Sequence, residues 1–98
     1  MAKKVIWSLR AQTDRKDILR YWIQRNKSNY YSVRLNKLFE EAANLISVFP
    51  NVGKKTEQEN IRIKIVRNYL LVYEEFENEI HILAIWSSHQ DPSNLKIG

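Results

Sequence analysis

The side chains that could do chemistry are few, and they lie in the second half of the chain. Arg62 and Lys64 alternate along a short apolar stretch, Arg67 follows it, and His81 and His89 come later. Arginine and lysine can grip a phosphate, and histidine exchanges protons near neutral pH. The alternative is an ordinary solvated strand face for the two cations and a surface histidine without a role.

These residues do not predict a metal centre. His81 and His89 are eight positions apart, and neither has a cysteine or carboxylate at ligand spacing. The 98-residue chain has no cysteine, so thiolate ligands, a cysteine nucleophile and disulfides are excluded. We expect no cofactor and no small-molecule substrate.

The candidate arginine, lysine and histidine side chains all lie in residues 61–92, so the structure of this stretch must position them. Its β-branched and aromatic runs, separated by short turn-compatible segments, predict three strands joined by hairpins. The expected side-chain faces are Ile61, Ile63 and Ile65 toward the helices, Arg62 and Lys64 outward, and Ile80, Ile82, Ala84 and Trp86 together on the last strand. Residues 69–73 are all apolar or aromatic, which indicates a central strand covered on both sides. Tyr69 and Tyr73 are therefore expected in the core.

Residues 1–60 supply the remaining elements. Residues 3–8 predict a short first strand, and Ser8 can cap a helix that runs through Arg25. A polar break at 26–29 precedes a second apolar periodicity, which runs from Tyr31 to Phe49 before Pro50 ends it. Residues 54–60 are polar and without period, so we expect a loop there. A hairpin of two helices cannot enclose a core alone and needs the sheet.

Length and charge restrict the function further. Ninety-eight residues suit one domain, 1–98, and no apolar run approaches the ~20 residues of a membrane span. We expect a soluble cytoplasmic protein. The net charge is +5, and residues 1–50 hold ten basic and four acidic side chains. Such a basic surface favours nucleic acid or an acidic protein as partner, with a solvated helix face as the alternative.

Several segments together resemble the RelE/ParE superfamily of toxins from bacterial toxin–antitoxin systems. The segments that carry the resemblance are Val5-Ile6-Trp7-Ser8 followed by Ala11, Phe49-Pro50-Asn51-Val52-Gly53, Arg62, the tyrosine-bracketed strand 69–73, and Ile82-Leu83-Ala84-Ile85-Trp86 leading to Gln90-Asp91-Pro92. The resemblance implies an α+β fold of order β-α-α-β-β-β. In it, the helix hairpin packs on one face of a mostly antiparallel four-stranded sheet.

The resemblance implies one of two activities. RelE-like members are ribosome-dependent nucleases that cleave mRNA without a metal, whereas ParE-like members poison DNA gyrase. RNA cleavage needs a base, an acid and cations at the phosphate, and the candidate catalytic residues are Arg62, Lys64 and His89. However, Leu70 and His89 stand where many relatives carry arginine. We therefore favour a ParE-like, gyrase-directed toxin that is not an enzyme, with mRNA cleavage as the alternative and a degenerate, non-toxic antitoxin-binding module as the second.

The same resemblance implies a cognate acidic antitoxin as partner. Exposed cations with neighbouring apolar groups such as Trp22 and Tyr30 would suit its tail. Arg67, His81 and Gln90 are the other candidate binding residues. A homodimer of the free chain is a further alternative.

Overall fold

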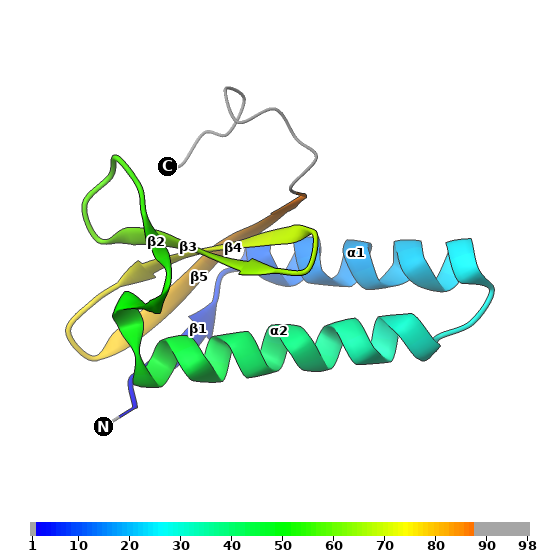
Figure 1. Ribbon diagram of the computed structural model, residues 1–98, viewed down its shortest axis with the longest axis horizontal. Helices are drawn as coiled ribbons and strands as arrows, with labels where there is room; N and C mark the ends of the chain where they lie inside the picture. Colours follow the sequence, from blue (N-terminus) through cyan, green and yellow to red (C-terminus); the bar gives the residue numbers. More distant parts are fainter. Residues whose placement is uncertain (1, 88–98) are drawn as a thin grey trace.

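The computed structural model describes residues 2–87, which form a helix hairpin and a five-stranded sheet (Figure 1). In chain order the elements are β1 (Lys4–Trp7), α1 (Leu9–Asn26), α2 (Tyr30–Val48), the short 3-10 helix η1 (Pro50–Val52), β2 (Lys54–Lys55), β3 (Ile61–Val66), β4 (Tyr69–Glu75) and β5 (Glu79–Ser87). The strand order is β1-β5-β4-β3-β2, with β1 parallel to β5 and the other neighbours antiparallel. Both helices lie on one face of the sheet. The predicted α+β arrangement is confirmed.

The sheet has one strand more than the four that we expected. Lys54 and Lys55, in the stretch predicted as a loop, pair with Ile63 and Arg62 of β3. Backbone hydrogen bonds pair this strand with β3. Two residues are too few to show an alternation of apolar and polar side chains, so the sequence carries no sign of the strand. In residues 2–87, neither long helix carries an apolar run that could cross a membrane.

The two helices begin and pair as their sequences predict. The Ser8 hydroxyl caps α1 by accepting from the Ala11 N–H at 3.0 Å, and it donates to the Leu83 carbonyl at 2.9 Å. Arg15 joins the helices, because its guanidinium reaches Asn36 at 2.7 Å and Glu40 at 3.0 Å on α2. Ser8 therefore connects the start of α1 to β5, and Arg15 connects α1 to α2.

The main core lies between the helix hairpin and the sheet. Its largest fully buried members come from α2, β4 and β5 and are Leu35, Phe39, Ile46, Leu71, Tyr73, Ile80 and Ile82. Burying one such side chain stabilises the fold by roughly 1.5–3 kcal/mol. A smaller cluster of Ile61, Val72, Ala84 and Trp86 is buried on the other face of the sheet. The central strand β4 is thus covered on both sides, as predicted.

The predicted faces of β3 are reversed. Arg62, Lys64 and Val66 are paired with Tyr73, Leu71 and Tyr69, which belong to the helix-side core. Directly paired residues share a face, so the three isoleucines of β3 point away from the helices. Alternation shows which residues share a face but not which face meets the helices. Both faces of this sheet bury apolar side chains, so burial could not decide between them.

The last strand contains a bulge that the sequence did not reveal. Tyr73 pairs with Ile82 and the preceding Val72 pairs with Ala84, which leaves Leu83 as an extra residue on β5. Ile80 and Ile82 therefore lie on the helix side with Ile85, while Ala84 and Trp86 lie on the other face. The expectation that these four alternating residues share one face was wrong.

The turn after α2 is fastened to the sheet by Tyr73. Its buried hydroxyl donates to the Pro50 carbonyl at 2.7 Å and accepts from the Gly53 N–H at 2.9 Å. A Cβ at Gly53 would lie 2.5 Å from that hydroxyl oxygen, so only glycine leaves room for the tyrosine. Arg62 adds a hydrogen bond to the Gly53 carbonyl at 2.9 Å. Glycine is therefore needed at position 53, because the backbone of the turn lies directly against the side chain of Tyr73.

We predict that Tyr73→Phe lowers the free energy of unfolding by about 1–3 kcal/mol, because the Pro50 carbonyl and the Gly53 N–H lose their buried partner. Gly53→Ala should cost a similar ~1–3 kcal/mol by overpacking the same contact. Urea unfolding followed by circular dichroism measures both.

Tyr30→Phe is the matched control, because the side chain of Tyr30 is 70% exposed and its hydroxyl has no hydrogen bond in residues 2–87. It should change the unfolding free energy by less than about 0.5 kcal/mol. Equal stability of Tyr73→Phe and Tyr30→Phe would refute the role given to the Tyr73 hydroxyl.

Candidate functional site

Arg62 lies at the start of β3, beside the turn after α2. Its guanidinium donates to the Gly53 carbonyl at 2.9 Å and reaches the Asn51 carbonyl at 3.4 Å. It also lines a largely polar cavity of about 330 Å³ with Glu59 and Glu75. Glu75 forms an ion pair with Lys3 at 2.8 Å, and Lys55 also lines the cavity. Arg62 supports the turn through its two carbonyl contacts.

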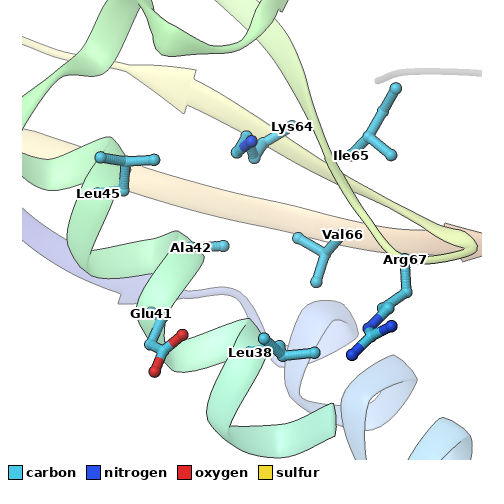
Figure 2. Close-up of a pocket in the computed structure, with 8 residues that line it drawn as sticks. All are labelled: Leu38, Glu41, Ala42, Leu45, Lys64, Ile65, Val66 and Arg67. Atoms are coloured by element: carbon cyan, nitrogen blue, oxygen red, sulfur yellow. The ribbon is translucent and has the colours of Figure 1, made fainter.

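Lys64 and Arg67 lie at the other end of β3, across from α2. Figure 2 shows a groove there, and its volume is about 310 Å³. It is lined by Leu38, Glu41, Ala42, Leu45, Lys64, Ile65, Val66 and Arg67. Within residues 2–87, neither cation has a hydrogen bond or ion pair. The structure brings Lys64 and Arg67 together on this groove and separates both from Arg62.

Arg67 has an unusual backbone. Its φ is 58°, in the left-handed region that favours glycine, at the tight turn between β3 and β4. A side chain other than glycine costs about 1–2 kcal/mol in that conformation. Strain of this kind is often retained where the side chain has a use. The sequence predicted a turn here but gave no sign of which residue would take the left-handed conformation.

His81 is held at the far end of the sheet. Its Nε2 lies 2.9 Å from the Glu79 carboxylate, and its ring centroid lies 4.5 Å from that of Phe76. It pairs in register with Glu74 on β4 and Ile6 on β1. His81 is therefore engaged with residues near the β4–β5 turn and lines neither the Arg62 cavity nor the groove.

Trp22 has mainly a packing role. Its indole N–H donates to the Tyr69 hydroxyl at 2.7 Å, and its ring packs edge-on against Tyr21 and Tyr31. Burial raises the pKa of Tyr69 above the ordinary value, although the hydrogen bond from Trp22 opposes the shift. Burial likewise raises the pKa of Tyr73. Both hydroxyls therefore stay protonated to higher pH than usual.

The remaining predicted residues lie apart from these groups. Tyr30 is exposed at the first turn of α2, while His89 and Gln90 fall outside the described residues. Within residues 2–87, Lys64 and Arg67 share the groove beside α2, and the other predicted residues lie in separate places. No group of three His, Cys, Asp or Glu side chains in this part of the chain is arranged to hold a metal ion.

The sequence did not predict the groove. Leu38, Ala42 and Leu45 belong to the apolar periodicity of residues 31–49, which predicts that they face the core. Ala42 is buried in the core and Leu38 packs against it, while 39% of Leu45 remains exposed. All three also line the groove.

Known proteins were compared with the chain and its fold. A sequence model described as the ParE toxin of the type II toxin–antitoxin system parDE matches residues 5–92. A solved structure titled "Chromosomal ParDE TA system from P. aeruginosa" has a similar fold, with a TM-score of 0.74 and 14% sequence identity. The match covers 88% of this chain and 96% of that one. No curated protein matches the chain.

The raised pKa values predict how stability depends on pH. A tyrosine whose pKa is higher in the folded chain contributes stability that is fully present below pH ~10 and is lost as pH rises through the folded value. Above pH ~10 each of Tyr69 and Tyr73 should therefore lower the unfolding free energy by up to ~1.4 kcal/mol per pH unit. Urea unfolding between pH 8 and pH 11 measures the slope.

The double variant Tyr69→Phe/Tyr73→Phe should have a flatter alkaline slope than the wild-type chain, whatever its stability at pH 8. Tyr30→Phe, on the exposed surface, should retain the wild-type slope. A double variant with an unchanged slope would show that other groups cause the alkaline loss.

Proposed function

The chain belongs to the ParE toxin family of type II toxin–antitoxin systems, and we propose that it inhibits growth by binding DNA gyrase and is neutralised by a cognate antitoxin. Family membership, which rests on the match to residues 5–92, is the observation that carries the proposal. The similar fold of the ParDE structure is consistent with it. The toxin would act in the cytoplasm, where gyrase is found.

A mode of action by binding is supported by the positions of the candidate catalytic residues. Arg62 donates to two turn carbonyls, whereas Lys64 lines the groove beside α2. Cleavage of RNA needs an acid, a base and cations around one phosphate. Among the described residues, Arg62 and Lys64 line different cavities, so they do not provide such a set together.

An acidic antitoxin is supported by the charge of the chain. The net charge is +5, because residues 1–50, which contain both helices, carry +6 and residues 51–98 carry −1. Opposite charge on a partner steers association and excludes basic competitors. Tyr30 adds an exposed aromatic side chain to this surface, while the indole N–H of Trp22 is already occupied by Tyr69. Of the two residues first assigned to the antitoxin contact, Tyr30 is therefore the better candidate.

A ribosome-dependent mRNA nuclease is the second candidate function. It is favoured by the two cations Lys64 and Arg67, which share one groove and have no partner in residues 2–87. Their side chains could bind a phosphate there by charge-assisted hydrogen bonds. Under this alternative His89, one of the candidate catalytic residues, would exchange protons.

We predict that inducing this chain alone in a bacterial host stops cell division and triggers the DNA-damage response, while bulk mRNA stays intact. The purified chain should inhibit gyrase supercoiling in a dose-dependent manner, because binding removes the enzyme from its cycle. Co-expression of the neighbouring open reading frame should restore growth.

The outcomes separate the candidate functions. Cleavage of mRNA within codons, together with normal gyrase supercoiling, would support the nuclease alternative and contradict gyrase inhibition. Harmless induction of a chain that still binds the neighbouring product would identify a non-toxic binding module. The control is induction of Gly53→Ala, whose cost of ~1–3 kcal/mol should lower the amount of folded toxin, and hence toxicity, to the same degree by either route.

A further inference from the structure

The distal half of the helix hairpin, residues 20–37, carries positive charge that no described residue neutralises. This segment contains five basic and no acidic side chains. The five, all exposed, are Arg20, Arg25, Lys27, Arg34 and Lys37. Within residues 2–87, none of them forms an ion pair. Figure 1 shows both helices extending past the β3–β4 turn at this end, so the charge stands clear of the sheet. This end of the molecule therefore attracts a polyanion.

A pocket with aromatic walls lies at the base of this distal hairpin. Its volume is about 320 Å³. Its lining residues come from α1, from the β3–β4 turn and from the strand ends beside it, and they are Tyr21, Trp22, Arg25, Asn68, Tyr69 and Ser87. Tyr21 and Arg25 belong to both the pocket and the distal hairpin. The pocket and the basic surface are therefore continuous.

Several groups in this pocket are available to a ligand. The Tyr69 hydroxyl accepts from the Trp22 indole N–H at 2.7 Å, and its own hydrogen is donated to no described residue. Within residues 2–87, the side chains of Asn68 and Arg25 have no hydrogen-bond partner. The ring of Tyr21 contacts Trp22 edge-on, and 52% of this tyrosine is exposed. The pocket thus offers one open aromatic ring, one cation, one amide and one hydroxyl donor.

These groups match the parts of an unpaired nucleotide. An exposed aromatic ring is a platform on which a base of any sequence can stack. The amide of Asn68 offers a donor and an acceptor side by side, the pattern that pairs with the edge of a base. The guanidinium of Arg25 suits the geometry of a phosphate. A row of cations beside such a platform is typical of proteins that follow a single-stranded backbone.

We propose that the distal hairpin and this pocket bind a single-stranded stretch of DNA. One unpaired base would stack on Tyr21 with its edge toward Asn68. The adjoining phosphates would pair with Arg25 and with the other cations of residues 20–37. The choice of DNA over RNA rests on the proposed function, because gyrase carries DNA. The pocket and its charge do not depend on that function.

The chemistry of this surface favours single-stranded nucleic acid over other partners. An acidic peptide would neutralise the cations, but its carboxylates would make no use of the Tyr21 ring. A duplex would offer phosphates to the same cations, but its bases are stacked on one another and would leave the pocket empty. A second copy of this chain would bring a net charge of +5 toward a basic surface.

Fluorescence anisotropy of labelled oligonucleotides, titrated with the purified full chain, tests the proposal. Single-stranded DNA should bind at least about fivefold more tightly than the duplex of the same sequence, because only an unpaired base can stack. The logarithm of the binding constant should fall linearly with the logarithm of the salt concentration. A glutamate-rich peptide that carries the same charge as the oligonucleotide should not displace it.

Two pairs of variants separate the pocket from general charge attraction. Tyr21→Ala should weaken single-strand binding by about tenfold and leave duplex binding unchanged. Its control is Phe76→Ala, which removes an exposed ring at the opposite end of β4 and should change neither. Arg25→Gln should reduce the salt slope by about 0.7, the share of one phosphate contact. Its control is Arg10→Gln, which removes an exposed arginine at the start of α1 and should retain the wild-type slope.

Crosslinking locates the bound base without a change to the protein. A single-stranded DNA that carries one iodouracil should crosslink to Tyr21 on irradiation, and mass spectrometry of the digested product identifies the residue. A crosslink found only in segments outside the pocket overturns the assignment of the pocket.

The remaining outcomes each decide one part of the proposal. Equal binding of single strand and duplex, or equal slopes for Arg10→Gln and Arg25→Gln, overturns the pocket. Tighter binding of RNA than of DNA overturns the choice of DNA, and displacement by the acidic peptide overturns nucleic acid as the ligand. Gyrase inhibition by a chain that binds no oligonucleotide overturns this surface and leaves the proposed function intact. Oligonucleotide binding without gyrase inhibition leaves this surface intact and overturns the proposed function.

Discussion

The burial of the central strand β4 on both faces is the constraint on which the rest of the structure depends. Leu71 and Tyr73 are buried under the helix hairpin, and Val72 is buried in the cluster on the other face. The helices therefore cannot dissociate from the sheet without exposing this strand. Because the Tyr73 hydroxyl also holds the turn after α2, the end of the hairpin is fixed to the strand that the hairpin covers.

This constraint also separates the charged residues. The pairing of β3 with β4 places Arg62 and Lys64 on the helix side, where each remains partly exposed. Arg62 meets the carbonyls of the turn, and Lys64 lies at the groove. The fold thus places Arg62 beside one cavity and Lys64 with Arg67 beside another.

The groove beside α2 illustrates how stability and recognition can compete. Well-packed elements support it on both sides, yet its rim holds a strained Arg67 and a strand edge that β2 leaves open. Neither feature stabilises the isolated chain.

The sequence by itself determined the order of the elements, the helix hairpin, the central position of residues 69–73 and the resemblance to the family. Those features depend on local periodicity and on caps such as Ser8, which neighbouring residues specify. Only the tertiary structure decided which face of β3 meets the helices, where β5 bulges at Leu83, and that Arg62 lies apart from Lys64 and Arg67. These depend on contacts between distant segments, and an alternation of period two is the same for either face of a sheet.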